Sequence, residues 1–558
     1  MRAEPVLGFF SVGMIAVLAG PVLAGLIGVL LPAFGHFPQA GLTGPTFQPF
    51  RDLFDWPGIG PSIRLSVTTG LIATLASLIL SLVIVATTQG TRGFAAVQAM
   101  LAPLLSVPHA AAAFSLAFLI APSGFVARAL SPWATGWDRP PDVLIVGDPQ
   151  GFALVAGLVI KEVPFLLLMI LAALPQVRPS QTLLSAAALG YGRVSAWFFC
   201  VFPNIYRQIR LPIYAVLAFS MSVVDVALIL GPTTPSSLSV NIVRWMSDPD
   251  ISLRTRAAAG AVVQLGLVLS VVAAWWLAER LCAVIGRQVG PSGRRHGWAE
   301  RIWPIGAFAG MALVVTGVTG AGVLGLWSVA GFWGFPDVLP DGVSLRGWRR
   351  HASDLGKALS DTVVIAFLAT AAALVLVVSA LQSDRPKSAR WLVYLPLIIP
   401  QTVFLPGLQT LLIGANADRG IGPVIAAHLI FVLPYVYLTL VDPWRAWDSR
   451  YASVGAALGR SPMAVLFTLR LPMLLRPVLT AVAVGTAVSV GQYLPTLLIG
   501  GGRVSTLTTE ALALASGGDR QAIAVFAIMQ TLAALAPFAI ALGLPALVWR
   551  NRRGLSNG

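Results

Sequence analysis

Charged residues are scarce in this sequence of 558 residues. Asp, Glu, Lys and Arg make up 11% of the chain, hydrophobic residues make up 57%, and the mean hydropathy is +0.82. Soluble globular domains carry about a quarter charged residues. Apolar runs such as 6–34, 258–284 and 523–549 reach or exceed the roughly 20 residues that cross a bilayer as a helix. The composition therefore excludes a soluble domain and predicts an all-α integral membrane protein.

Other absences exclude whole classes of site. Cys200 and Cys282 are the only cysteines, so no disulfide framework is indicated. The five histidines lack the spacing of metal ligands, and the 22 acidic residues are scattered singly instead of forming a Mg²⁺ site. No Gly-x-x-x-x-Gly-Lys-Ser/Thr phosphate loop occurs. We therefore expect no cofactor, no metal and no enzymatic activity in this chain.

The apolar runs predict about twelve transmembrane helices. Their ranges are 6–33, 65–87, 97–121, 151–174, 213–232, 258–284, 303–332, 359–381, 392–414, 423–441, 477–500 and 523–548. If the amino terminus is inside, the inner segments hold 22 of the 37 Lys and Arg with six acids, whereas the outer loops hold 14 basic residues with 13 acids. This asymmetry follows the positive-inside rule and places both termini in the cytoplasm. The net charge of +15 thus reflects topology, and no nucleic-acid partner is expected.

The sequence contains an internal repeat. Residues 183–203 match 452–472: each copy has Ala-Leu-Gly followed by a proline 13 residues after the glycine, at an offset of 269 residues. Nearer the start of each copy the offset rises to between 292 and 294, because the outer loop 122–150 is longer than its counterpart 415–422. Repeats of six crossings keep the same orientation, so the pattern predicts two parallel pseudo-repeats.

This duplication predicts two halves in one chain. They are 1–286 and 302–558, joined by the Gly-, Pro- and Arg-rich stretch 287–301, which we expect to be a cytoplasmic linker. Each half has one long inner loop, at 176–212 and 444–476, which is too apolar for a solvated linker.

Both long inner loops have one pattern: a short helix of small residues, a glycine, an amphipathic helix and a proline. A glycine can adopt the left-handed conformation that ends a helix, and small residues permit close packing against another protein. The prolines are expected to stop the second helix before the chain re-enters the membrane. The candidate partner-binding residues are Ser185, Ala186, Gly190 and Pro203 in the first loop, and Gly455, Ala456, Gly459 and Pro472 in the second.

The second loop resembles the EAA signature of binding-protein-dependent ABC importer permeases. That signature runs Glu-Ala-Ala, three residues, Gly, nine residues, an aliphatic residue, one residue and Leu-Pro. Gly459, Leu469, Leu471 and Pro472 match it, whereas Ser453 stands in place of the acidic residue.

The first loop resembles the same signature with more departures. Gly190 and Pro203 match, but Cys200 occupies the aliphatic position, Phe202 replaces the leucine, and Leu184 stands in place of the acidic residue. In that family these loops form coupling helices that dock into a cleft of a cytoplasmic ATPase.

The resemblance implies a type I ABC importer permease with both halves fused, similar to the permeases of ferric iron and thiamine transport. It implies a separate cytoplasmic ABC ATPase, expected as a homodimer, a periplasmic solute-binding protein, and a multi-pass location in a bacterial inner membrane. Thiamine-like cations, ferric iron, polyamines and small oxyanions all remain candidate substrates.

Four polar residues at membrane depth occupy matching places in the two halves. His109 and Gln401 follow a proline in the third segments, and Asp225 and Gln492 lie in the fifth. Polar groups at this depth are costly and often functional, so they could line a translocation path. Hydrogen bonds between packed helices are an equally good explanation.

Three further polar residues favour a structural interpretation. Lys161 and Glu162 are expected to pair with each other at a bend before Pro164, and His428 is expected to bond to a neighbouring backbone group.

Two other functions are alternatives for a membrane protein of this kind. A secondary transporter of twelve helices also has a parallel repeat, but its long cytoplasmic loop usually joins the halves, whereas here the centre is short. A membrane enzyme such as a lipid-phosphate transferase needs clustered acids or a His/Asp pair, which the scattered acids do not provide.

Overall fold

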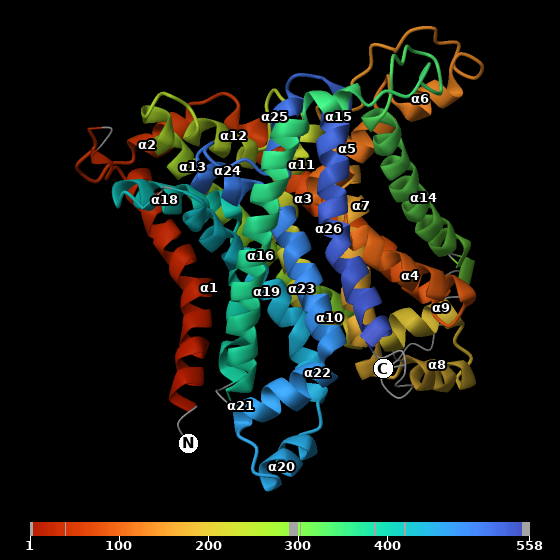
Figure 1. The fold of residues 1–558 in the computed structure, drawn as a ribbon. Helices are drawn as coiled ribbons and strands as arrows, with labels where there is room; N and C mark the ends of the chain where they lie inside the picture. Colours follow the sequence, from red (N-terminus) through yellow and green to blue (C-terminus); the bar gives the residue numbers. More distant parts are fainter. Residues whose placement is uncertain are drawn as a thin grey trace.

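The fold is a bundle of long helices. A computed structural model describes residues 4–38, 41–289, 300–301, 303–383, 387–417 and 420–548. Within these ranges the chain forms helices and two isolated β-bridges but no strand, which confirms the all-α prediction. Figure 1 shows that the start of α1 and the end of α26 lie at the end of the bundle that also carries α8 and α20. Most of the predicted linker 287–301 lies outside the described residues.

The elements of the first half are, in chain order, α1 (Glu4–Ala33), α2 (Gln48–Phe54), α3 (Ile59–Thr88), α4 (Arg92–Ser106), α5 (His109–Ile120), α6 (Phe125–Leu130), α7 (Phe152–Val177), α8 (Pro179–Ala188), α9 (Arg193–Ala196), the π-helix η2 (Trp197–Val201), α10 (Phe202–Ser222), α11 (Asp225–Leu230), α12 (Leu238–Met246) and α13 (Ser252–Val289).

The second half continues with α14 (Trp303–Ser328), α15 (Arg346–Arg350), α16 (Ala352–Gln382), the 3-10 helix η5 (Lys387–Tyr394), α17 (Leu395–Ile398), α18 (Gln401–Gly414), α19 (Ile421–Ala446), α20 (Arg450–Ala457), α21 (Pro462–Val465), the π-helix η6 (Leu466–Arg470), α22 (Leu471–Met473), α23 (Leu475–Val490), α24 (Leu494–Gly500), α25 (Leu507–Ala515) and α26 (Arg520–Val548).

Several predicted membrane helices are broken. Nine helices of the described residues are long and apolar enough to cross a membrane, or up to eleven if each of two bent pairs is one span. The predicted spans 97–121 and 392–414 break at Val107 and Ile399, whose ψ angles of 122° and 120° are extended. Each of these residues precedes a proline, and the proline ring disfavours the helical conformation of the residue before it. The predicted continuous third segments are therefore wrong.

The fifth segment of each half is also interrupted. Instead of single helices over 213–232 and 477–500, the chain forms α10 and α11 in the first half and α23 and α24 in the second. The π-helices η2 and η6 precede these segments at the same 269-residue offset as the sequence repeat. A π-turn is rare, so its occurrence at matching positions supports the register of the duplication.

The two halves interleave at their first helices. Helix α1 packs against α16 and α18 of the second half, and α14 packs against α3 and α5 of the first half. Figure 1 shows α1 and α14 on opposite sides of the bundle. Helix α13 of the first half likewise packs against α18 of the second half, and α26 of the second half packs against α5 of the first half. The halves are thus held together through lipid-facing helices as well as at the centre.

Glycines bring α1 and α18 into backbone contact. A Cβ added at Gly25 would collide with the carbonyl oxygen of Phe404, and one added at Gly407 would collide with the carbonyl oxygen of Gly25. Small residues at helix crossings permit this approach, which maximises packing where lipid offers no hydrophobic driving force.

Substitution at this crossing should therefore destabilise the fold. We expect Gly407→Leu to lower the stability of the purified chain by about 1–3 kcal/mol or more, because the leucine must displace backbone atoms. The thermal unfolding midpoint in detergent measures this. Gly20→Leu on the same α1 is the matched control, since nothing lies within 4 Å of a Cβ at Gly20. Equal midpoints for the two variants would contradict the assignment.

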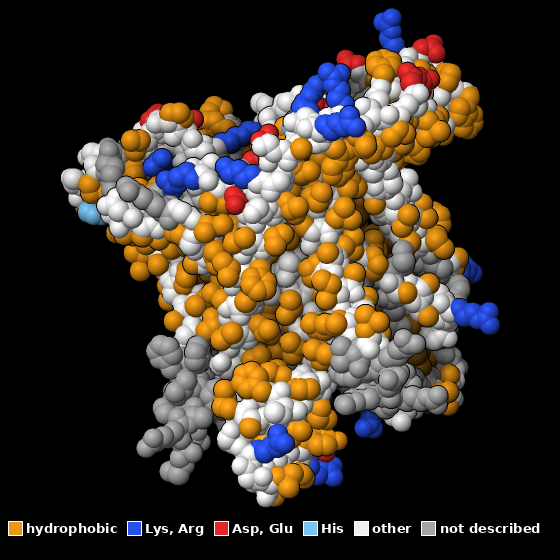
Figure 2. Space-filling model, viewed as in Figure 1, with side chains coloured by type: hydrophobic (Ala, Val, Ile, Leu, Met, Phe, Trp, Pro, Cys, Tyr) orange, Lys and Arg blue, Asp and Glu red, His pale blue; other side chains and the backbone are white. Residues whose placement is uncertain are grey.

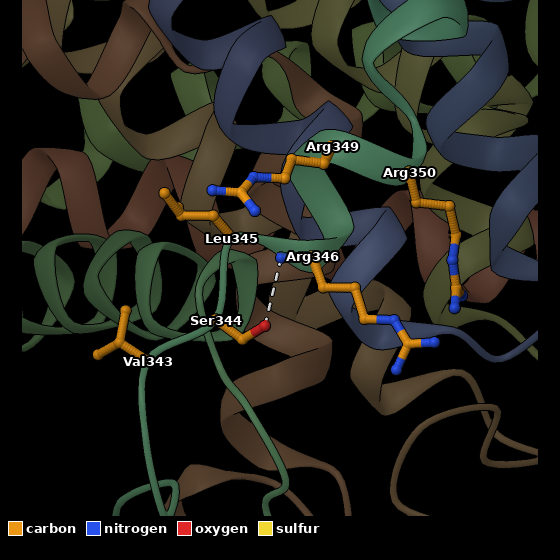
Figure 3. A pocket seen from close by; sticks show the side chains of 6 residues that line it. All are labelled: Val343, Ser344, Leu345, Arg346, Arg349 and Arg350. Atoms are coloured by element: carbon orange, nitrogen blue, oxygen red, sulfur yellow. Dashed lines mark hydrogen bonds between the residues drawn. The ribbon is translucent and has the colours of Figure 1, made fainter.

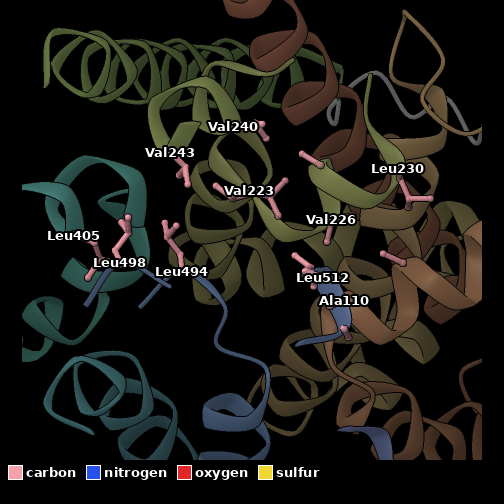
Figure 4. Packing of buried hydrophobic residues seen from close by; sticks show 14 of the residues in the cluster. Ala110, Val223, Val226, Leu230, Val240, Val243, Leu405, Leu494, Leu498 and Leu512 are labelled. Atoms are coloured by element: carbon pink, nitrogen blue, oxygen red, sulfur yellow. The ribbon is translucent and has the colours of Figure 1, made fainter. Parts of the chain in front are cut away.

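The surface shows the expected membrane belt. Figure 2 shows apolar side chains covering the middle of the visible face, with acidic side chains mostly at the end that carries α15 and α6. Inside, one apolar cluster spans both halves, and Figure 4 shows part of it. There Leu405 of α18 lies beside Leu494 and Leu498 of α24. Val226 of α11 and Leu512 of α25 belong to the same cluster, so elements of both halves pack together around the interrupted segments.

Candidate functional site: two coupling loops and the central helix breaks

The first inner loop has the helix–glycine–helix geometry that its sequence predicts. Helix α8 ends at Gly190, whose φ of +79° is left-handed. The Gly190 amide donates to the Ala187 carbonyl at 2.8 Å, and the Tyr191 amide donates to the Ala186 carbonyl at 3.1 Å. These bonds satisfy the last carbonyls of α8, as in the common glycine-terminated helix end.

The second inner loop repeats this geometry. Gly459 has a φ of +75°. Its amide donates to the Ala456 carbonyl at 2.9 Å, and the Arg460 amide donates to the Gly455 carbonyl at 3.0 Å. Each bond is the counterpart of one in the first loop at the 269-residue offset, so the two loops present one shape twice at the same end of the bundle (Figure 1).

The small residues of these loops divide between two roles. Ala186 and Gly455 are buried, and a Cβ at Gly455 would lie 2.7 Å from Val465 of the second helix in its own loop. These positions therefore pack the loop internally. The outward-facing residues at the tips are Ser185, Leu189, Ala456 and Leu458. Exposed leucines at the end of a helix bundle indicate a surface for a protein partner.

Pro203 does not stop the second helix of the first loop, which corrects the sequence-based expectation, whereas the second helix of the second loop ends at Met473, directly after Pro472, and the chain there bends by 80°. Pro203 lies in the first turn of α10, directly after η2, and Pro472 lies in α22, directly after η6. A proline removes one amide donor and clashes with the carbonyl four residues earlier. The wider π-turn before each proline accommodates that missing bond, and in the first loop the helix continues through α10.

The second loop is fixed by an arginine stacked between tryptophans. The guanidinium of Arg470 lies 4.1 Å from the ring centre of Trp444 and 4.8 Å from that of Trp447. It donates to the Trp444 carbonyl at 2.8 Å and to Gln382 Oε1 at 3.0 Å. Stacked, hydrogen-bonded arginines are held rigidly, so η6 is anchored to α16 and α19.

The first loop uses other contacts. The indole of buried Trp197 donates to Gln89 Oε1 at 2.9 Å. The carboxylate of Glu300, at the end of the inter-half linker, accepts from the amides of Val194 at 3.0 Å and Ser195 at 3.1 Å. A carboxylate at this place satisfies free amides at the start of a helix and favours its positive dipole end.

Glu300 thus supplies a cap that the first loop lacks. In the second loop Ser461 caps its own helix by accepting from the Ala464 amide at 3.2 Å. The equivalent residue of the first loop is Gly192, where any side chain would collide with the Glu300 carboxylate.

This arrangement gives a paired prediction. Glu300→Ala should destabilise the first loop by about 1 kcal/mol and so speed hydrogen exchange at the Val194 and Ser195 amides about five-fold. Ser461→Ala should speed exchange at Ala464 by a similar factor and leave the first loop unchanged. Exchange rates resolved by mass spectrometry or NMR measure both effects. Unchanged exchange at Val194 in the Glu300 variant would show that the cap does not form.

The interrupted helices meet at the centre of the bundle. The break between α4 and α5 lies beside the break between α23 and α24, since a Cβ at Gly491 would lie 3.8 Å from Pro108. Helix α10 packs against α17 across the halves. At this place His109 Nε2 lies 3.8 Å from Glu162 Oε1, and its ring centre lies 5.0 Å from that of Phe219.

Comparisons with known proteins agree with this geometry. The chain is 29% identical over 549 residues to the inner membrane ABC transporter permease protein YnjC of Escherichia coli K12, covering 98% of each chain. It is 29% identical over 127 residues to a spermidine/putrescine transport system permease protein PotC homolog of Mycoplasma pneumoniae, covering 23% of this chain and 44% of that protein. It is 29% identical over 167 residues to the molybdenum transport system permease protein ModB of Mycobacterium tuberculosis, covering 28% of this chain and 62% of that protein.

Over almost its whole length the chain is similar to an ABC transporter permease, and its two repeated halves match a fused permease of that kind. No family model matches it, and no solved structure matches it. The full-length match to YnjC and the partial matches to the shorter PotC and ModB relatives, of each of which the chain spans less than two thirds, carry this assignment together with the all-helical fold.

The four candidate path residues lie at the helix breaks. His109 and Gln401 are the first residues of α5 and α18, and both are partly exposed. Asp225 is the first residue of α11, whereas Gln492 lies two residues before α24, and both are buried. Asp225 lies within electrostatic range of His109. His109 and Asp225 thus lie within electrostatic range on the first half, and Gln401 and Gln492 lie on the second half.

Lys161 and Glu162 lie within electrostatic range of each other but form no ion pair within 4 Å, and Lys161 finds its hydrogen-bond partners elsewhere. Lys161 Nζ donates to the carbonyls of Leu104 at 3.1 Å and Leu105 at 3.4 Å, and to that of Val107. These are the carbonyls left free where α4 ends, so the ammonium caps the broken helix at the negative end of its dipole. Neighbouring residues on a helix point in different directions, and Glu162 faces His109 instead.

His428 also differs from its expected role. Its Nδ1 lies 2.8 Å from Ser489 Oγ and its Nε2 lies 2.8 Å from Thr496 Oγ1, so it bonds to two hydroxyls and not to backbone. Ser489 belongs to α23 and Thr496 to α24. His428 therefore bridges the break in the second half, whereas Lys161 contacts only the α4 side of the break in the first half.

Sequence reasoning missed three members of the central group in this permease. Glu162 was treated as the local partner of Lys161, although their adjacent positions on a helix could have indicated that they face apart. Tyr435 lies within electrostatic range of Glu162, and Tyr493 within range of Asp225. Both tyrosines come from the second half, so no local pattern could have revealed the contact.

The opposite end of the permease carries a basic pocket. It is lined by the segment from Val343 to Leu345 and by three arginines of α15, Arg346, Arg349 and Arg350. Figure 3 shows the three guanidinium groups spread around this segment, with the Arg346 amide donating to Ser344 Oγ at 3.2 Å.

Proposed function

We propose that this permease is the membrane subunit of an ATP-driven importer. A separate cytoplasmic ATPase, expected as a homodimer, docks on the two coupling loops, and a periplasmic binding protein delivers a small solute to the opposite end. The observation that carries the proposal is the pair of matched loops at one end of the bundle, with the same glycine turns and the same hydrogen bonds. Two coupling loops of the same shape suit an ATPase that has two identical subunits.

The orientation belongs to the same proposal. The excess of basic residues in the segments at the coupling-loop end favours a cytoplasmic location for both loops and both termini, in a bacterial inner membrane. A thiol reagent that does not cross membranes should then label Ser185→Cys and Ala456→Cys only after the cell is opened. The basic pocket of α15 would face the periplasm and offer a contact for an acidic rim of the binding protein.

A twelve-helix secondary transporter is the competing function. The two are separated by energy source: an ATP-driven importer loses uptake when ATP is depleted and keeps it when a protonophore collapses the ion gradient. The importer also retains an ATPase through affinity purification of the tagged chain, with ATP hydrolysis in the eluate. Uptake that follows the gradient and not ATP would overturn the proposal.

The names of the relatives do not select a substrate. One is named for spermidine and putrescine transport and another for molybdenum transport.

A further inference from the structure

The end of the bundle opposite the coupling loops carries a lateral projection, which we call the overhang and define as residues 122–145 and 329–344. Figure 1 shows α6 and the loops around it projecting sideways beyond the end of α14. The second of the two segments folds back on itself, since the Gly331 amide donates to the Gly342 carbonyl at 2.8 Å. The overhang is therefore built from one loop region of each half.

A buried arginine fastens the two segments of the overhang together. Arg128 of α6 is 4% exposed, and its guanidinium donates to the carbonyls of Asp337 at 3.0 Å, of Trp333 at 3.4 Å and of Gly334. The same group lies 5.0 Å from the ring centre of Trp333. A buried guanidinium with several hydrogen bonds and a stacked ring holds its partners in one geometry. The overhang is therefore a fixed surface that joins both halves.

Large apolar side chains stand exposed on this fixed surface. Trp133 and Leu144 of the first segment are 76% and 68% exposed, and Phe332 and Leu339 of the second are 77% and 65% exposed. Single exposed apolar residues are ordinary, but four large ones on two segments that are fastened together indicate a contact surface. Figure 2 shows apolar side chains along the lower and outer edges of the overhang, with charged side chains at its upper edge.

The apolar edge of the overhang continues the lipid-facing surface of α14. Phe308, Met311, Val315 and Val318 recur every three or four residues, so they share one face of this helix, and they are 52–75% exposed. Helix α14 ends at Ser328, and the second segment of the overhang begins at the next residue. Because no spacer separates the two, the overhang starts at the level where the apolar belt of the bundle ends.

The charge of the overhang favours lipid over a soluble partner. Its exposed charged residues are four acids and one arginine, namely Asp138, Arg139, Asp142, Asp337 and Asp341. A binding protein whose acidic rim contacts the arginines of α15 would be repelled by this acidic edge. Tryptophan, in contrast, is enriched where a protein surface meets the boundary between membrane and water.

We infer that the overhang rests on the bilayer at the end opposite the coupling loops, with Trp133 and Phe332 inserted into the lipid and the acidic edge in water. The apolar face of an interfacial element lies about 5–10 Å into the boundary of headgroups and acyl chains. This inference goes beyond the proposed import function and does not depend on it. Each half then contacts the membrane through a loop region as well as through its helices.

Nitroxide labels measure the depth of these side chains. Trp133→Cys and Phe332→Cys are made separately in a background with Cys200→Ser and Cys282→Ser, which replaces the only native cysteines. The labelled full chain is placed at one copy per nanodisc without any other protein. Electron paramagnetic resonance then gives the collision rates of each label with oxygen, which concentrates in lipid, and with a nickel chelate, which stays in water. We expect the ratio of oxygen to nickel collisions to be several-fold higher at both positions than at Arg139→Cys, the exposed control on the same overhang.

The alternatives give different results in the same experiment. Equal ratios at the apolar positions and at the control would overturn the lipid contact. If both labels are open to nickel in the nanodisc but become shielded when a periplasmic extract is added, the surface binds a soluble partner and the inference is wrong. Shielding that occurs only in nanodiscs with two copies would assign the surface to a second copy of this chain and would overturn it as well. Leu144→Cys and Leu339→Cys repeat the measurement if either of the first variants does not fold.

Discussion

The double variant Leu189→Asp with Leu458→Asp is expected to lose its ATPase and its transport activity. Both leucines lie directly before the left-handed glycines at the loop tips, with 65% and 74% of their surface exposed. Burying a leucine in an interface contributes about 1.5–3 kcal/mol, and a carboxylate placed there must also be desolvated. The two changes together should weaken the complex by at least about 3 kcal/mol, which is more than a hundred-fold in affinity. Affinity purification and ATP-dependent uptake measure the loss.

The control uses the same chemistry at the other end. Leu339→Asp with Leu144→Asp replaces two leucines of similar exposure, 65% and 68%, in outer loops. Because all four side chains are exposed, both double variants should fold normally and share the thermal unfolding midpoint of the unaltered chain. If the coupling-loop variant keeps its ATPase, or if the outer-loop variant loses it equally, the claim that the two coupling loops bind the ATPase is wrong.

Much of the coupling end could be predicted because its structure is set by local chemistry. Gly190 and Gly459 were identified from sequence because a glycine after a run of small residues is a strong signal for a left-handed helix end. The structure places both in that conformation. The helix breaks could be predicted only in part. Pro108 and Pro400 were identified from the sequence, but the interruption that each proline causes at the preceding residue, Val107 or Ile399, was not predicted.

Features that depend on distant segments could not be predicted from one sequence. The crossing of α1 with α18 joins glycines nearly four hundred residues apart in the chain, and a glycine in the sequence does not indicate which helix it will contact. The same holds for Glu300, whose carboxylate caps a helix more than a hundred residues earlier. The π-turns η2 and η6 lie directly before Pro203 and Pro472 and accommodate the amide donor that each proline lacks.

The two halves share a fold but differ in the chemistry at their breaks. Where the first half has Lys161 and Glu162, the equivalent residues 270 positions later are Phe431 and Val432. The second half uses the hydrogen bonds of His428 to Ser489 and Thr496 to bridge its break. The duplication therefore provides a symmetric frame with charge concentrated on one side, so the decisive substitutions of the path belong to the first half.

Asp225→Ala is accordingly expected to abolish uptake while the permease remains folded and keeps its ATPase. Asp225 begins the six-residue helix α11 beside the break after α10, and its side chain is buried. Its loss removes a buried carboxylate from the proposed path, and we expect a fall in uptake of about a hundred-fold. Uptake of labelled thiamine or spermidine, whichever the unaltered permease transports, measures the effect.

Further variants distinguish the loss of the negative charge from a loss of folded structure. Asp225→Glu keeps the charge and should retain part of the uptake, whereas Asp225→Asn keeps the size and should behave like the alanine variant. Gln492→Ala, at the break of the second half, should reduce uptake far less because it removes no charge. Normal uptake by Asp225→Ala would take this residue out of the path, and a lower unfolding midpoint for both the alanine and the asparagine variant would assign the carboxylate to holding α11 in place.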